Sequence, residues 1–234
     1  IGSKEAAVYQ LQDTGDNPSP AQPVQVKESG SNIRINTGPL SFEISRENFN
    51  FIENVTLDGK KILDPGKTPA LQIVEGAADN RLNSLGVPPY RVEVEYAGPM
   101  RACIRVDGVY TAENKYFLHY TMRIEAFSGK PDVAVRWKIR NSQKLWAFNA
   151  FVKKATLDTR LRGGGDVVKP ANPRKDGWIA VNGDAASMAL MIRFAKHYDN
   201  MDLTAQPDGV ISFQPFAGPG WIEKHMEYEW QLLY

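Results

Sequence analysis

Apolar and polar residues alternate along most of the chain after residue 24. Residues 31–36 and 40–45 carry apolar side chains at every second position, and Gly38-Pro39 interrupts the pattern between them. A period of two with one apolar face is typical of a β-strand that is buried on one side. This part of the chain is therefore predicted to consist of short strands.

Turn residues follow the strand-like segments at short intervals. Asp58-Gly59 separates residues 54–57 from residues 60–63, which predicts a tight β-hairpin. Longer alternating segments follow, with turns at Gly98-Pro99, Asp107-Gly108 and residues 128–131; these segments are residues 90–96, 100–106, 116–127 and 133–140. Strands joined by tight turns rather than by helical crossovers favour an antiparallel sheet.

The last third of the chain continues this pattern less regularly. Residues 161–177 are rich in glycine, proline and charge and are predicted to form a long loop, while residues 193–202 offer a short helix. The remaining strand predictions are residues 149–157, 178–184, 187–193, 210–215 and 227–233. The fold class is therefore all-β with very little helix.

The domain organisation follows from a change in composition near residue 24. Residues 1–23 contain three prolines and no large apolar residue after Leu11, so they are predicted to be a flexible tail or linker. Residues 24–234 form the β-sandwich region. It is either one unit or two packed subdomains of about residues 24–85 and 86–234.

Composition excludes several classes of protein. Lys+Arg is 28 and Asp+Glu is 27, a net charge of +1, which rules out a chain-wide electrostatic footprint for nucleic acid. No apolar segment approaches the roughly 18 residues of a membrane span. The single cysteine, Cys103, cannot form an intrachain disulfide, and its alternating surroundings predict a buried thiol in a strand.

The sequence contains no signature of a metal or organic cofactor. His119, His197 and His225 lack the spacing of a local ligand pair, and no phosphate-cradling glycine loop precedes a helix pattern. We therefore expect no structural metal and no cofactor.

A candidate ligand site lies on the long strand at residues 116–127. There His119, Thr121, Arg123 and Glu125 share one face. Further arginines at alternate positions of the neighbouring strands suggest anion recognition, because a guanidinium can donate two parallel hydrogen bonds to a carboxylate. The candidate ligand-binding residues are Arg101, His119, Arg123, Trp137 and Trp178. An ordinary solvated sheet face is the alternative interpretation.

The tryptophans divide by their place along the strands. Trp146, Trp178 and Trp221 lie near loop ends and are the better candidates for stacking on a sugar ring. Trp137 and Trp230 lie within strands, where aromatic side chains usually pack in the core.

Several segments together resemble the YetA-like and exo-rhamnogalacturonan-lyase-like family. These segments are residues 32–44, 57–59, 98–108, 123–133, 177–178, 193–198 and 207–209, and the resemblance spans about residues 30–234. It implies a barrel-like N-terminal part joined to an antiparallel β-supersandwich of the galactose-mutarotase-like kind, as in many polysaccharide lyases. In such proteins an α-helical toroid often supplies part of the active cleft, and this chain has no series of amphipathic helices for one.

Three functions fit these observations. The first is a β-sandwich module of a carbohydrate-active protein that is non-catalytic alone and binds or positions acidic polysaccharide, with the remaining domains of a parent protein as partners. The second is a complete small polysaccharide lyase acting by β-elimination, which needs neutralisation of a uronate carboxylate and a base for the C5 proton. The third is a structural β module of a surface or virion assembly. We expect an extracellular or periplasmic location, with the cytoplasm as the alternative, because a chain without disulfides is compatible with both.

Overall fold

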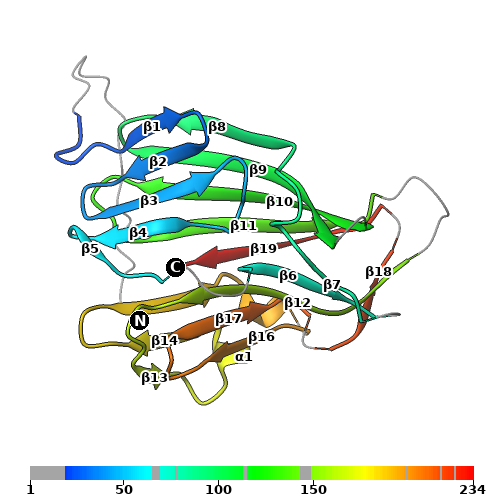
Figure 1. Cartoon of the computed structure of the whole chain (residues 1–234). Coiled ribbons are helices and arrows are strands. Elements are labelled where there is room, and N and C mark those ends of the chain that lie inside the picture. The colour runs from blue at the N-terminus through cyan, green and yellow to red at the C-terminus, as the bar shows by residue number, and fades with distance from the viewer. Residues whose placement is uncertain are drawn as a thin grey trace, which may run out of the picture.

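The computed structural model describes residues 19–64, 69–76, 79–112, 115–142, 149–198, 200–216, 218–223 and 225–234. Within them the chain forms two antiparallel β-sheets with very little helix, as the alternating pattern predicted (Figure 1). Of the proposed tail, residues 1–18 lie outside the described part. Nothing in the described part divides the chain at residue 85, so the subdomain boundary stays a prediction.

The first sheet, called the N-terminal sheet, has the strand order β1-β2-β3-β4-β5. Its strands are β1 Gln25–Ser29, β2 Asn32–Asn36, β3 Leu40–Ser45, β4 Glu53–Leu57 and β5 Lys60–Lys61. Asp58 and Gly59, both at positive φ, join β4 to β5 in a two-residue loop. This confirms the hairpin predicted at this dipeptide, because such a turn requires left-handed backbone at both central positions.

The second sheet, called the long sheet, has the order β13-β14-β15-β19-β11-β10-β9-β7-β6-β12-β17-β16, with β18 paired to β12 and β8 paired to β9. Its strands are β6 Leu71–Glu75, β7 Arg81–Asn83, β8 Arg91–Ala97, β9 Arg101–Ala112, β10 Lys115–Phe127, β11 Val133–Arg140, β12 Ala150–Arg160, β13 Asp166–Val168, β14 Trp178–Asn182, β15 Ser187–Ile192, β16 Asp202–Ala205, β17 Val210–Gln214, β18 Gly220–Ile222 and β19 Glu227–Leu233. The predicted antiparallel succession of the strands around residues 90–140 is confirmed as β8, β9, β10 and β11.

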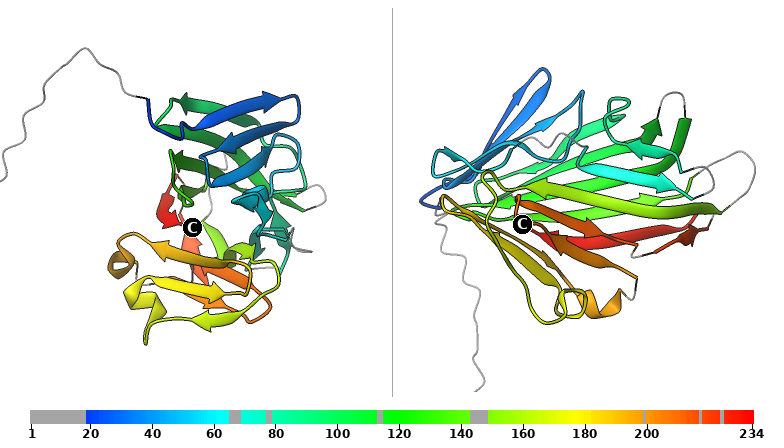
Figure 2. Two further views of the ribbon diagram at one scale, coloured as in Figure 1. Left: turned by 90° about the vertical axis from the view of Figure 1, so that its left-hand side faces the viewer. Right: turned by 60° about the horizontal axis from the view of Figure 1, so that its bottom comes forward.

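The N-terminal sheet packs on one face of the long sheet and shares a core with it. In Figure 1 its blue and cyan strands lie across the green strands of the long sheet, and the ring of Phe49 stacks on Tyr120 of β10 at 5.8 Å between centroids. The yellow and orange strands of the C-terminal half gather below the green ones (Figure 2), and β14 contacts β16 and β17. The long sheet therefore curls back on itself around Trp137, Trp230 and Phe213.

Three local predictions are corrected. The strand expected to end at Asp107-Gly108 continues as β9 to Ala112, because the Asp107 carboxylate accepts a hydrogen bond from Thr121 and Gly108 makes room for the Tyr120 ring on the next strand. The predicted loop at residues 161–177 contains β13 and the short helix α1 Pro173–Asp176, whose N-cap Asn172 accepts a hydrogen bond from Lys175 N–H. The helix expected within residues 193–202 is reduced to the 3-10 turn η1 Ala195–His197.

Among the described residues, no helix has the length and apolar character needed to cross a membrane.

Candidate functional site: the outer face of the long sheet

The outer face of the long sheet is the face that points away from the N-terminal sheet. On β10 the side chains of His119 and Arg123 are half-buried on this face, whereas Tyr120 and Met122 are fully buried on the other. The predicted division of this strand into a polar and an apolar face is therefore confirmed. Paired strands keep their side chains on the same side of a sheet, so neighbouring strands extend the polar face.

Trp137 is not part of this face. It alternates along β11 with Arg136 and Lys138, which are on the outer face, and its own side chain is fully buried in the core. Its ring lies 5.8 Å from that of Trp230. The placement of Trp137 with the arginines was wrong, because neighbouring residues of one strand point to opposite faces.

Acidic side chains bridge the arginines of neighbouring strands across the outer face. Glu95 accepts hydrogen bonds from Arg123 Nε at 2.7 Å and Nη2 at 2.9 Å and lies 3.5 Å from Arg105. Asp107 in turn lies 2.9 Å from Arg105 Nε and 3.6 Å from Arg91 Nε. The arginine content of this region therefore serves ion pairing within the sheet, and Arg123 is occupied by a bidentate partner.

At one end of this network the outer face changes from charged to apolar. Glu125 lies 2.6 Å from Arg136 Nη2 and 3.7 Å from Arg101 Nη1, so it bridges two strands. Glu125 is also the first member of a lateral row of paired residues that continues across β11, β19, β15 and β14. The row is Glu125, Ala134, Leu233, Met191 and Trp178.

A depression of about 630 Å³ lies along this row. It is lined by Arg101, Glu125, Phe127, Ala134, Val135, Arg136, Met191, Ile192, Arg193, Gln231, Leu232 and Leu233. The Met191 side chain is 45% exposed. Three arginines therefore surround an apolar floor, an arrangement that can hold a carboxylate beside an apolar sugar face.

A second hollow of about 600 Å³ lies next to the depression and includes Met100 and Lys130. The Met100 side chain is 59% exposed. Arg101 and Phe127 line both hollows, so the two are adjacent.

Of the predicted site residues, the structure brings Arg101 into the depression and places Trp178 next to Met191 in the same row. His119 lies two residues before Thr121 on β10, on the side away from Glu125 and the depression. Burial and the Arg140 charge lower the pKa of His119, while Asp107 raises it, and the ring of Tyr90 approaches it at 6.0 Å between centroids. His119 is therefore separate from the depression.

Cys103 is buried in β9, as predicted. Burial, together with the charges of Glu125 and Glu95, raises the pKa of its thiol to about 11. A thiol in that state carries almost no thiolate at neutral pH and is not a nucleophile.

Trp221, on β18, does not line the depression. It is 59% exposed, and its ring contacts that of Phe151 at 4.6 Å between ring centroids. Trp146 lies outside the described residues.

Among the described residues, no group of three His, Cys, Asp or Glu side chains is placed to hold a metal ion.

Sequence reasoning missed Met191, Arg193 and Leu233. Alternation marks Met191 as outward-facing in the segment 187–193, but no local signal indicates which strand pairs with this one. Arg193 enters the site because its backbone N–H donates to Gln231 O at 2.9 Å, an interaction between distant parts of the chain.

Comparison with known proteins gives three matches. The family model of the PcRGLX-like protein central beta sandwich domain matches residues 24–144, which contain the whole N-terminal sheet and the outer-face strands β8 to β11. The uncharacterized protein YetA of Bacillus subtilis (strain 168) is 24% identical over 124 residues, which are 50% of this chain and 14% of YetA. The crystal structure of the α-galactosidase from Lactobacillus brevis aligns with a TM-score of 0.40 and 8% identity over 91% of this chain and 39% of that one. The chain therefore covers much less than two thirds of the length of YetA.

Proposed function

The chain belongs to the family of PcRGLX-like central β-sandwich domains, and we propose that it binds acidic polysaccharide and positions it for the other domains of a longer protein. The family makes the chain a carbohydrate-related β-sandwich module. The finer assignment, to an acidic polysaccharide, is supported by the depression on the outer face. An extracellular or periplasmic location belongs to the same proposal, because such polymers are found outside the cytoplasm.

One observation carries the proposal: three guanidinium groups surround an apolar floor on an otherwise charge-paired face. Arg136 and Arg101 share Glu125, and each guanidinium has five N–H donors, so each can also bind a ligand carboxylate. Arg193 stacks its guanidinium over the Phe194 ring at 4.9 Å, which orients it at the edge of the depression. Met191 and Leu233 offer the apolar surface that the C–H face of a sugar ring covers.

The chemistry of the described lining favours binding over catalysis by this chain. β-Elimination needs a base for the C5 proton beside the group that neutralises the carboxylate. The titratable residues that line the depression are Arg101, Glu125, Arg136 and Arg193, and Glu125 is bound to two of these arginines. Tyr120, whose phenol group could act as such a base, is buried on the opposite face of β10.

The test is isothermal titration calorimetry of the whole chain with rhamnogalacturonan and polygalacturonate oligosaccharides. We expect saturable, salt-sensitive binding that Arg136→Ala and Arg193→Ala each weaken by about fivefold or more, since each removes a charge-assisted contact. Arg162→Ala is the matched control, because Arg162 is an exposed arginine outside the depression and its loss leaves the affinity unchanged. If Arg136→Ala and Arg193→Ala fold correctly and bind with the same affinity as the parent chain, the binding site lies elsewhere.

The same samples distinguish the alternatives. We expect no increase in the ultraviolet absorbance of unsaturated uronate product during incubation with polysaccharide. Such an increase, lost in the arginine variants, would make the chain a complete lyase. Absence of both binding and turnover in the parent chain would favour the structural module.

A further inference from the structure

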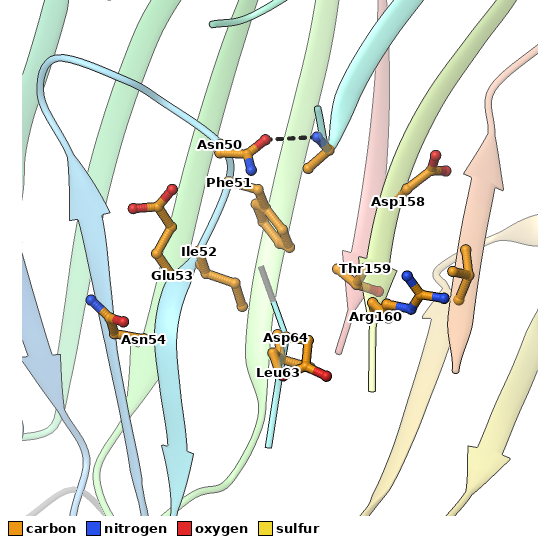
Figure 3. A pocket seen from close by; sticks show the side chains of 12 residues that line it. Asn50, Phe51, Ile52, Glu53, Asn54, Leu63, Asp64, Asp158, Thr159 and Arg160 are labelled. Atoms are coloured by element: carbon orange, nitrogen blue, oxygen red, sulfur yellow. Dashed lines mark hydrogen bonds between the residues drawn. The ribbon is translucent and has the colours of Figure 1, made fainter. Parts of the chain in front are cut away.

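A further pocket, distinct from the two hollows of the outer face, lies where the N-terminal sheet meets the end of β12. It is on the other side of the long sheet from the outer face. Its cavity is about 190 Å³. Figure 3 shows Glu53 and Asn54 of β4 on one wall, Thr159 and Arg160 of β12 on the other, and Asp64 between them. The outer-face residues described above do not line it, so it is a separate site.

Two buried polar atoms of this wall have no hydrogen-bond partner among the described residues. They are Thr159 Oγ1, on a side chain only 7% exposed, and Asp158 Oδ1. A buried polar atom without a partner costs free energy, so native proteins usually satisfy such atoms with water or a ligand. Thr159 lines the cavity, so a molecule inside the cavity can satisfy its hydroxyl group.

The charges of the lining select against an acidic ligand. Glu53, Asp64 and Asp158 supply three carboxyl groups, whereas Arg160, which also lines the cavity, is ion-paired to Asp208. Burial raises the pKa of Asp158, and burial with the charge of Glu43 raises that of Glu53. A ligand anion would be repelled by the ionised carboxyl groups. A ligand rich in O–H groups would instead donate hydrogen bonds to their oxygen atoms.

The described carboxylates also do not form a metal site. No group of three His, Cys, Asp or Glu side chains in the described part of the chain is close enough to hold an ion. The cavity is smaller than the roughly 300 Å³ at which sites for drug-sized ligands begin, so it suits one small ring and not an extended chain.

We propose that this inter-sheet pocket binds a single neutral sugar residue, whose hydroxyl groups donate to Asp64 and exchange hydrogen bonds with Thr159. Adjacent hydroxyls of a sugar ring are spaced to bond the two oxygens of one carboxyl group. The pocket thus complements the outer face in its selectivity: it accepts uncharged rings, whereas the arginine-lined depression accepts uronates. The neutral-sugar site does not depend on binding at the outer face.

The experiment is an NMR titration of the ¹⁵N-labelled chain with D-galactose, L-rhamnose, D-galacturonate and calcium chloride. We expect at least one neutral sugar to shift the amide signals of Asn54, Thr159 and Arg160 in a saturable way. Galacturonate should bind at least about fivefold more weakly because of the carboxyl-rich lining. Calcium should leave these signals in place. No saturable shift with either neutral sugar, or the same shift with calcium, would overturn the proposal.

Two variants make the test specific. Thr159→Val keeps the shape of the side chain and removes the unpartnered hydroxyl, so it should weaken sugar binding by about fivefold or more while leaving the melting temperature unchanged or higher. Asp64→Asn, at a side chain 43% exposed, is a second variant that leaves the core untouched and should also weaken binding. Wild-type sugar affinity in both variants would refute the pocket as the site.

The matched control separates this inference from the outer-face proposal. Arg136→Ala should bind the neutral sugar as the parent chain does, and Thr159→Val should bind acidic oligosaccharides as the parent chain does. Loss of neutral-sugar binding in Arg136→Ala would contradict two independent sites.

Discussion

Arg123 on β10 reaches over the intervening strand β9 to donate two hydrogen bonds to Glu95 on β8. Glu95 lies at a β-bulge, because the register of β8 against β9 shifts between Val94 and Tyr96. The pair thereby fastens β8, whose described strand pairing is to β9 alone, to the centre of the long sheet.

The stabilisation from this pair should depend on pH. Hydrogen bonds from Arg123 lower the pKa of Glu95 below its ordinary value of 4.5. A lowered pKa means that the stabilisation is fully present above about pH 4.5 and disappears as the pH falls through the folded-state value. We expect Glu95→Gln to reduce the free energy of unfolding by about 0.5–1 kcal/mol at pH 7 and by less at pH 3.

Urea unfolding at the two pH values measures this difference. Glu93→Gln is the control, since Glu93 is 55% exposed and lies 4.0 Å from Arg91. Equal destabilisation by the two substitutions at pH 7 would contradict a special role for the bidentate pair.

The buried Cys103 thiol should resist modification in the folded protein. With a pKa of about 11 and only 4% of its surface exposed, it presents little thiolate to a reagent at pH 8. We expect almost no reaction with an aromatic disulfide reagent in the native protein, and one equivalent after unfolding in guanidinium. Rapid native-state labelling would show that this part of β9 opens easily.

Trp137 and Trp178 should differ strongly in their contributions to stability. Trp137 packs against Trp230 and Phe213 in the core, whereas Trp178 is partly exposed on the outer face. We expect Trp137→Ala to cost about 3–5 kcal/mol and Trp137→Phe less, since the cost grows with the cavity that is left. Trp178→Ala should cost about 1 kcal/mol or less. Similar losses of stability in Trp137→Ala and Trp178→Ala, measured by thermal unfolding, would contradict the placement of Trp137 in the core and of Trp178 at the surface.

Gly108 should tolerate no side chain, although it lies within a strand. A Cβ atom there would lie 2.2 Å from the Tyr120 hydroxyl oxygen, and Tyr120 is held between Phe49 and Tyr110. We expect Gly108→Ala to destabilise the protein by about 1–3 kcal/mol through overpacking. Gly30→Ala is the control, because no atom lies within 4 Å of a Cβ placed there. An unchanged melting temperature in Gly108→Ala would show that the Tyr120 ring can move.

Alternation in the sequence was sufficient to predict the strands and the two faces of β10. The side-chain direction in a strand reverses at every residue, so the separation of His119 and Arg123 from Tyr120 and Met122 depends only on local geometry. The Asp58-Gly59 turn was equally local. The same alternation places Trp137, between Arg136 and Lys138, in the core, as expected for an aromatic residue within a strand, and its inclusion among the candidate ligand-binding residues was inconsistent with this pattern.

The dipeptide Asp107-Gly108 marks where local reasoning failed. The same residue types that form the turn at Asp58-Gly59 continue a strand here, because Asp107 binds Thr121 and Arg105 on the outer face while Gly108 admits the Tyr120 ring below. Thr121 and Tyr120 lie on the neighbouring strand β10. Contacts between strands therefore override the local preference of this dipeptide for a turn.

What the sequence determined by itself was the all-β fold class, the amphipathic strands and the positions of most turns, since these depend on the side-chain period and on backbone preferences of single residues. Only the tertiary structure decided that β15 pairs with β19, which brings Met191 beside Leu233 and extends the row to Trp178. It also decided that Thr159 and Asp158 of β12 meet Glu53 of β4 around one cavity. Backbone hydrogen bonds are the same for any pair of strands, so partner choice is settled by the burial of side chains that are distant in sequence, and this information is spread over the whole chain.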